Sequence, residues 1–270
     1  MTTCYFDRNI FDQIDKKRDI TDDDLKILRE AIAKRKVEIL VSFETVQETA
    51  NAKQDTAVRG LKLISEVSRA AFPIKSHNEL VNDDIQSFAA GKQAPSPFLY
   101  GKFSLAHVIE DIEKSSPEIL TLLKDDKSER DTLNAKLKKL VEDERKMLNG
   151  KRPRTFKAYW DERSNFYGEG FAYYAGALEQ CKELGIERLL DVRSVRVLVG
   201  ALLSLLYAVM IEGRAIKDGT ARDIQHAGPM STADFVITDD GELRRLLRRI
   251  PIDDFSVLDL QELITFIRSN

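Results

Sequence analysis

DFVITDDG, residues 234–241, is the stretch that decides the predicted fold. A short apolar, β-prone run stops at a threonine and two acids, and a helix-like segment follows at residues 242–249. The pattern predicts a strand that delivers carboxylates at its C-terminal end. In a parallel α/β sheet, ligands bind outside those ends, so these acids can converge with acids that follow other strands.

Two other segments have the same design. The apolar run at residues 4–6 leads into Asp7, and the run at residues 37–41 ends at Ser42, which is expected to cap the next helix. A further acid lies at the start of a predicted helix just before residues 234–241. The acids expected at one edge of the sheet are Asp7, Glu44 or Glu48, Asp223, and Asp239 or Asp240.

The length and composition predict one folded unit with a long helical insertion. The chain has 270 residues, and 43% of them are hydrophobic, which is enough for a substantial core. Residues 75–190 are richer in charged and turn residues and include a long helical stretch at 117–149. We therefore expect residues 1–74 and 191–270 to form two parts of an α/β core, with a helical subdomain at 75–190 between them.

The charge balance and the cysteines exclude several classes of protein. The net charge of −3 comes from 42 basic and 45 acidic residues, so a nucleic acid would have to meet local basic patches. The only cysteines, Cys4 and Cys181, predict neither a disulfide framework nor a thiolate metal site, and a cytoplasmic location is expected. We expect no signal peptide and no membrane partner. The longest apolar run, residues 197–211, is short for a bilayer and predicts a buried helix.

The order of these segments resembles the PIN-domain nucleases. The resemblance rests on YFDRNIF at residues 5–11, Ser42 followed by Glu48, then Asp223, then FVITDD at residues 235–240. Residues 252–258 and 259–267 resemble the closing strand and helix of that family. The resemblance covers roughly the first and last sixty residues. It implies a PIN-like three-layer fold with a mostly parallel sheet flanked by helices.

The resemblance also implies a chemistry, which is the metal-dependent hydrolysis of phosphodiester bonds. Clustered carboxylates repel one another, and Mg²⁺ or Mn²⁺ would relieve that repulsion. Such an ion lowers the pKa of a bound water and stabilises charge on the leaving oxygen. The substrate would be RNA rather than DNA, and the protein would be an endoribonuclease, in a toxin-like or defence role. The implied catalytic and metal-binding acids are Asp7, Glu48, Asp223 and Asp240, with Asp239 as the alternative to Asp240.

Other side chains have expected roles around these acids. The groups expected to support the ligands through hydrogen bonds are Asn9, Ser42, Thr238 and Glu44. Asp223 has an alternative role as the cap of its own helix, with Thr220. His226, three residues later, either touches substrate or is simply packed. Arg8 occupies a position that often carries a small hydroxyl residue in the family, so it either contacts a phosphate or neutralises the acids without metal.

Two basic surfaces are candidates for contact with nucleic acid. Basic and aromatic residues alternate in the cluster that contains Arg152, Arg154, Lys157 and Trp160. Arg244 and Arg245 begin a second basic face, after the strand at 235–237. Both have a simpler interpretation as solvated surface. The helical insertion is a candidate for binding a regulatory protein or for forming a homo-oligomer.

Two alternatives to a nuclease are considered. The first is a catalytically silent PIN-like module that binds a protein or a nucleic acid. The second is a phosphatase, although Asp7 lacks the second aspartate two positions on that a haloacid-dehalogenase-like phosphatase would carry.

Overall fold

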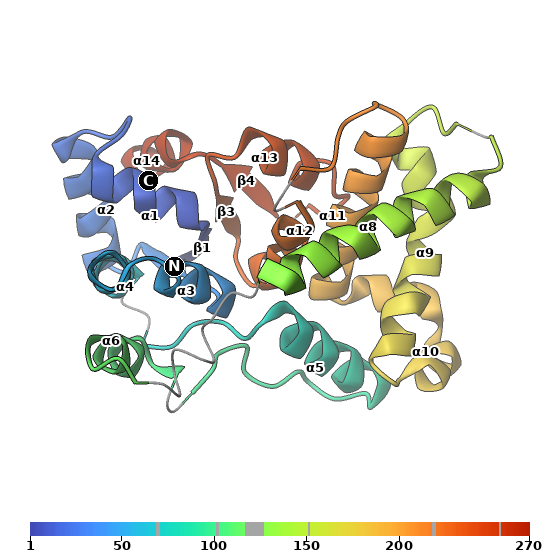
Figure 1. Cartoon of the computed structure of the whole chain (residues 1–270), viewed down its shortest axis with the longest axis horizontal. Coiled ribbons are helices and arrows are strands. Elements are labelled where there is room, and N and C mark those ends of the chain that lie inside the picture. Colours follow the sequence, from blue (N-terminus) through green and yellow to red (C-terminus); the bar gives the residue numbers. More distant parts are fainter. Residues whose placement is uncertain (69–70, 101–102, 117–126, 151, 218–219, 254) are drawn as a thin grey trace.

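A four-stranded parallel sheet lies at the centre of the molecule (Figure 1). The computed structural model describes residues 1–68, 71–100, 103–116, 127–150, 152–217, 220–253 and 255–270. The strand order is β2-β1-β3-β4, so the two ends of the chain meet in the middle of the sheet. The strands are β1 (Thr2–Phe6), β2 (Val37–Leu40), β3 (Phe235–Ile237) and β4 (Ser256–Leu258). An α/β fold with a parallel sheet is thus confirmed.

Both faces of the sheet are buried, which explains why its strands are almost wholly apolar. Successive side chains of β1 point to opposite faces. Cys4 and Phe6 enter one hydrophobic core, and Tyr5, between them, enters the other. In β3, Val236 and Ile237 divide in the same way.

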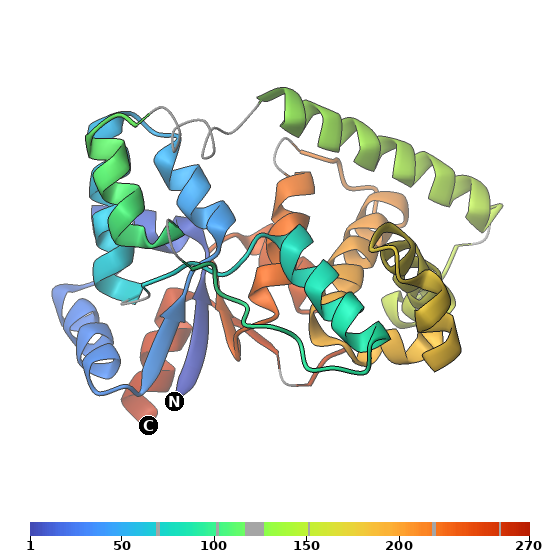
Figure 2. The same ribbon diagram turned by 90° about the horizontal axis from the view of Figure 1, so that it is seen from below.

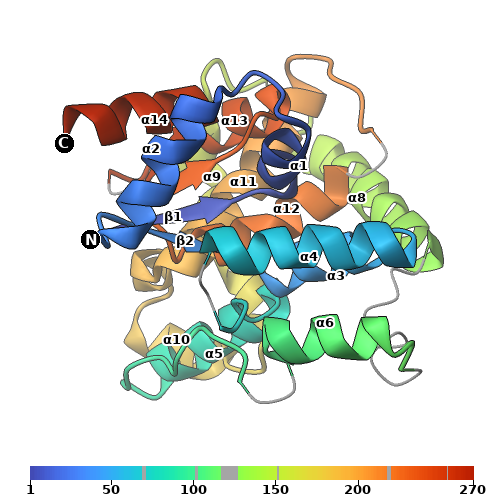
Figure 3. The ribbon, with the colours of Figure 1, turned by 90° about the vertical axis from the view of Figure 1, so that its left-hand side faces the viewer.

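The first core lies under helices from both ends of the chain. Figure 3 shows several of these helices in front of the sheet. Thr21 and Asp24, three residues apart, form a capping box at the start of α2. The helices that contribute to this core are α1 (Arg8–Lys16), α2 (Asp22–Ala33), α3 (Phe43–Ala50), α4 (Gln54–Ser68), α6 (Leu105–Glu113) and α14 (Leu260–Ser269).

The second core is larger and is built around α11. Nearly every side chain of this helix is buried, and α8 forms the outer edge of the layer (Figure 2). The elements of this core are α5 (His77–Ala89), α8 (Lys127–Leu148), α9 (Phe156–Tyr174), α10 (Leu178–Leu184), the 3-10 helix η2 (Ile186–Asp191), α11 (Arg193–Met210), α12 (Thr220–Met230) and α13 (Gly241–Leu247).

Within the described part of the expected insertion at 75–190, the regular elements are helices, with one isolated bridge between Ile74 and Phe98 and an irregular segment at 91–100. Its helices join both layers of the molecule: α6 packs on α4, whereas α5, α8, α9 and α10 share the core of α11. The division into a core and a separate subdomain therefore stays a prediction. The first part of the predicted helix, 117–126, lies outside the described residues.

One helix in the described part of the chain, α11, is long and apolar enough to cross a membrane. Most of it is buried inside the protein. The side chains of its neighbours cover it, so we interpret it as the central helix of the second core. The apolar run at residues 197–211 also predicted a buried helix.

Candidate active site

Asp7 follows β1 directly and is held from three directions. Its backbone N–H donates to the carbonyl of Ile237 at 3.1 Å, which fixes it beside the end of β3. Its Oδ1 accepts from the backbone N–H of Arg8 at 2.7 Å and caps α1. Its Oδ2 accepts from Asn9 Nδ2 at 2.9 Å and from Thr238 Oγ1 at 2.8 Å. Burial raises the pKa of Asp7, although His226 and these hydrogen bonds oppose the shift.

Thr238 connects Asp7 to the acids after β3. Its buried hydroxyl donates to Asp7 and accepts from the backbone N–H of Asp240 at 3.2 Å. Asp240 caps α13, because its Oδ1 accepts from the N–H groups of Glu242 and Leu243 at 2.7 and 2.9 Å. Within the described residues its Oδ2 has no hydrogen-bond partner and remains able to bind a cation.

Asp239 and Asp240 are both exposed and line one depression with Asn9, Gln13 and Arg18. Burial and the neighbouring Asp259 raise the pKa of Asp239. By contrast, Asp240 is among the charges that act on Asp223. The hydrogen bond to Thr238 and the effect on Asp223 therefore favour Asp240 over Asp239 as the fourth acid.

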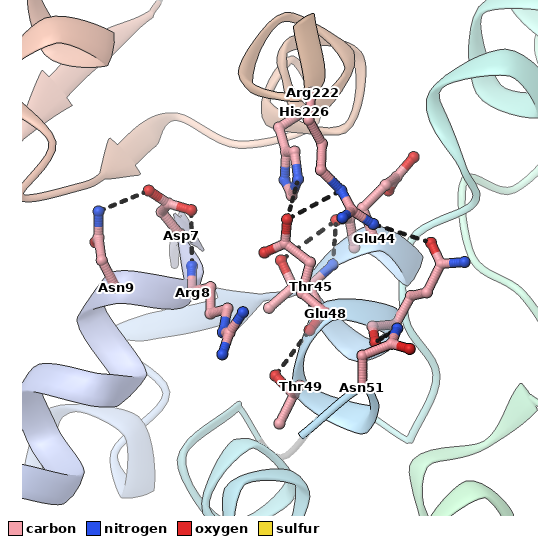
Figure 4. A network of polar contacts seen from close by, with 12 residues as sticks. Asp7, Arg8, Asn9, Glu44, Thr45, Glu48, Thr49, Asn51, Arg222 and His226 are labelled. Carbon is pink, nitrogen blue, oxygen red and sulfur yellow. Dashed lines mark hydrogen bonds and ion pairs between the residues drawn. The ribbon is translucent and has the colours of Figure 1, made fainter. Parts of the chain in front are cut away.

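Glu48, on α3, forms ion pairs with two side chains of α12 (Figure 4). Its Oε1 lies 3.0 Å from Arg222 Nε and 3.5 Å from His226 Nε2. Burial opposes the negative charge, but the contact with His226 and the charges of His226, Arg222 and Arg8 outweigh it and lower the pKa of Glu48. Glu48 is therefore ionised at neutral pH.

His226 is fully enclosed between the sheet and α3. Its Nδ1 lies 3.2 Å from the hydroxyl of Tyr5, which also lies 2.9 Å from Ser42 Oγ and 3.3 Å from Thr45 Oγ1. Burial alone would lower its pKa, but Glu48, with smaller effects from Glu44 and Asp7, raises the pKa of His226 to about 9. The imidazolium is thus a cation among the acids and donates from both nitrogens.

Asp223 lies one helical turn before His226 on α12. Burial, together with the charges of Asp240, Asp7 and Glu48, raises its pKa to about 7, against the opposite effect of His226. Its carboxylate makes no hydrogen bond to the described residues, and the start of α12 shows no capping by it. The hydroxyl of Thr220 instead accepts a hydrogen bond from the backbone N–H of Lys217, at 3.1 Å. The charges of Asp7, Glu48 and Asp240 therefore all act on Asp223.

Glu44 lies one turn before Glu48 on α3, but it contacts His77 at the start of α5. Its Oε1 accepts from the backbone N–H of His77 at 2.8 Å and lies 3.3 Å from His77 Nδ1. These bonds connect α3 to the start of α5. Of the two glutamates that the sequence left open, Glu48 is the one beside the other acids.

The donor set has the chemistry that a hard divalent cation requires. Burial and the neighbouring acids raise the pKa of Asp223. A cation beside it would therefore stabilise the ionised carboxylate. In the described part of the chain, no three His, Cys, Asp or Glu side chains are placed so that they hold an ion by themselves. Mg²⁺ usually keeps several waters and takes one or two carboxylates, so Asp7, Asp223 and Asp240 fit such an ion with water completing its shell.

Arg8 does not occupy the place of a metal. Its side chain extends away from the Asp7 carboxylate, towards the space between α1 and α3 (Figure 4). There it lines a narrow cleft of about 130 Å³ with Arg59 and Thr49. Arg222 and His226 pair with Glu48, and the charge of Arg8 also lowers the pKa of Glu48.

The other basic candidates lie elsewhere. Arg244 pairs with Asp259 at 3.1 Å and Glu262 at 2.9 Å, and Arg245 pairs with Glu212 at 2.7 Å, so both are engaged within the protein. The cluster with Arg152, Arg154, Lys157 and Trp160 lies at the start of α9, at the far end of the molecule from α1 (Figure 1). Within it, Lys157 pairs with Asp161 at 2.7 Å and Trp160 packs against the second core.

The network of Tyr5, Glu48, Arg222 and His226 was not predicted from the sequence. The sequence contained one signal of it, because Arg222 and His226 are four residues apart and so share a helix face.

Comparison of the chain with models of protein families, with curated proteins and with solved structures finds no match.

Proposed function

We propose that this chain is a PIN-like nuclease that uses Mg²⁺ or Mn²⁺ to hydrolyse phosphodiester bonds, with RNA as its substrate. Two observations support the proposal: Asp7 and Asp240 follow the carboxyl ends of the neighbouring strands β1 and β3, and the charges of Asp240, Asp7 and Glu48 act on Asp223. Burial opposes the negative charge of Asp7, Glu48 and Asp223, and a cation with a phosphate-bearing substrate would stabilise these carboxylates.

Each residue has a defined part in this proposal. The ion would supply an activated water and stabilise charge on the leaving oxygen. Asp7 is oriented for ligation by the N–H of Arg8 and by Asn9 and Thr238. Asp223 offers a carboxylate without competing hydrogen bonds among the described residues. Arg222 and His226 keep Glu48 ionised and fix its direction.

The test is cleavage of single-stranded RNA by purified protein with Mg²⁺ or Mn²⁺, and with EDTA. Asp223→Asn should reduce kcat by a hundredfold or more while leaving RNA binding nearly unchanged, because the carboxylate acts on charge that develops in the transition state. Glu242→Gln, which changes an acid in the first turn of α13, is the matched control and should stay active. Cleavage that resists EDTA or persists in Asp223→Asn would count against the proposal.

A second candidate function is the silent PIN-like module. The observation that favours it is the pairing of Glu48 with both Arg222 and His226, which already neutralises one of the four acids. This candidate predicts RNA or protein binding with no cleavage in either metal. The Asp223→Asn variant would then bind its partner as the wild type does.

A further inference from the structure

A broad groove with aromatic walls lies beside the site, between α8, α9, α11 and α12. It encloses about 860 Å³. Its lining includes Phe166, Phe171, Tyr173 and Tyr174 from α9, and Leu140 from α8. A cavity of this size accommodates several planar rings. The hydrolysis proposed above does not involve it.

Several of these aromatic side chains are unusually exposed. The exposed fractions are 51% for Phe166, 68% for Tyr173 and 85% for Tyr174. The ring of Tyr173 contacts that of Tyr174 edge-on at 5.7 Å, so both present large surfaces to solvent. Side chains of this kind on a surface mark a binding site more often than isolated exposed apolar residues do.

One helix connects the groove to the acids. Ala221 and Ile224 of α12 line the groove. Arg222 and His226, on another face of the same helix, pair with Glu48, and Asp223 lies beside the acids. A nucleic-acid strand with a phosphate at Asp223 therefore has to cross only α12 to place its neighbouring nucleotides in the groove.

The charge along the groove favours a polyanion. Lys136 lines it, and Lys138 and Lys139 follow on the exposed side of α8. None of the three lysines forms an ion pair with the residues that the structure describes, although Glu169 also lines the groove. Aromatic rings beside unpaired cations suit unstacked bases on a phosphate backbone better than they suit an apolar helix.

We propose that this groove, the aromatic groove, binds the bases of single-stranded RNA that flank the phosphodiester at the acids. The inference rests on the proposed function and names the form of its substrate. Tyr173, Tyr174 and Phe166 stack with bases, and Lys136 contacts a phosphate. A duplex does not fit, because its bases are already stacked on one another.

The test uses the full chain in EDTA, so that binding is measured without cleavage. The probe is single-stranded RNA that carries 2-aminopurine, whose fluorescence falls when the base stacks. The double variant Tyr173→Ala/Tyr174→Ala should lose the quenching and bind at least tenfold more weakly, since stacking contributes about tenfold or more for each base. Tyr173→Phe/Tyr174→Phe keeps the rings and should restore both.

Tyr100→Ala is the matched control, because Tyr100 is 60% exposed and lies outside the groove. It should leave quenching and affinity unchanged. Equal quenching in wild type and the double alanine variant would overturn the inference. So would a dimer, measured by light scattering, that the double alanine variant converts to monomer, because the groove would then join two copies of the chain.

The experiment separates this inference from the proposed function. If Asp223 is required for cleavage but the tyrosine variants change neither KM nor quenching, the groove assignment alone is wrong. If no metal supports cleavage but quenching depends on the tyrosines, the hydrolytic function is wrong and the groove remains an RNA-binding site.

Discussion

At the scale of single residues, the sequence predicted the acids but not what holds them. Asp7, Thr238 and Asn9 were expected together because each lies just beyond the end of a predicted strand, and the structure joins all three by hydrogen bonds. The contact between Tyr5 and His226 spans 221 positions in the chain. Such a contact depends on how α12 packs on the sheet, and no local pattern encodes that packing.

The first prediction concerns the response of stability to metal. Mn²⁺ binds the native state at the acids, so saturating metal should raise the Tm of the wild type by about 5 °C or more. Asp223→Asn removes a buried negative charge, so it should raise the Tm in EDTA and reduce the response to Mn²⁺. Differential scanning calorimetry measures both effects.

Asp239→Asn is the adjacent control for this prediction. Asp239 is not among the charges that act most strongly on Asp223, so its substitution should leave the response to Mn²⁺ intact. A reduced response to Mn²⁺ in Asp239→Asn, with a normal response in Asp240→Asn, would show that the metal binds Asp239 and not Asp240.

At the scale of elements, the sequence predicted most of the helices and strands. The capping box at Thr21 and the cap at Ser42 are both present, because each depends only on neighbours a few residues away. The apolar stripe of α8 showed that one side of the helix is buried. It did not show that Glu144, within that helix, is fully buried too, since a sequence shows a charge but not its partners.

The second prediction concerns the attachment of α8 to α9. Glu144 accepts from the hydroxyls of Tyr159 at 2.9 Å and Tyr167 at 2.8 Å, and lies 2.9 Å from Arg163 Nε. Glu144→Ala leaves these groups without their buried acceptor and should cost about 3 kcal/mol in the free energy of unfolding. Urea denaturation measures the cost. Glu142→Ala, on the exposed side of the same helix, should change it by less than about 0.5 kcal/mol.

The third prediction concerns Glu212, which ties the end of α11 to α13. Its carboxylate lies 2.7 Å from Arg245 and 2.5 Å from Arg249. Burial opposes its charge, but Arg249 and Arg245 outweigh burial and lower the pKa of Glu212. Because the folded pKa is below the unfolded value, the contribution to stability is present above about pH 4.5 and is lost as pH falls through the folded pKa.

Glu212→Gln should therefore destabilise the protein by about 1 kcal/mol at pH 7, and the difference from wild type should shrink towards pH 3. Urea denaturation across this pH range measures it. Glu183→Gln, at an exposed position on α10, is the control. A difference that stays constant with pH would mean that the carboxylate charge is not the stabilising feature.

At the scale of the whole molecule, the sequence predicted a parallel sheet but not how the middle of the chain joins it. Apolar stripes show that a helix face is buried without showing against what. The structure divides the helices of 75–190 between both cores, with α6 on one side and α8 to α10 on the other. A consequence is that the aromatic groove is built largely by α8 and α9, which the family resemblance does not cover.

The last prediction uses this arrangement to separate two basic surfaces by the length of the RNA they meet. Lys136 lines the aromatic groove and Lys139 is exposed on the same helix, whereas Arg152 and Arg154 lie at the far end of the molecule from α1. Lys136→Ala/Lys139→Ala should weaken binding of short and long single-stranded RNA alike. It should also reduce the slope of log K against log salt by roughly 0.7 for each phosphate that the protein no longer neutralises.

Arg152→Ala/Arg154→Ala should instead weaken only RNA long enough to extend from the acids to the start of α9, because a short strand bound at the acids never meets those side chains. Fluorescence anisotropy at several salt concentrations measures both slopes. Lys26→Ala, on the exposed side of α2 in the opposite layer, is the charge-matched control. The net charge of −3 gives the protein no general attraction for RNA, so a change of slope must come from the surface that the strand touches. If Lys26→Ala changes the slope as much as the groove variant does, the RNA has no defined path and the assignment of both surfaces is wrong.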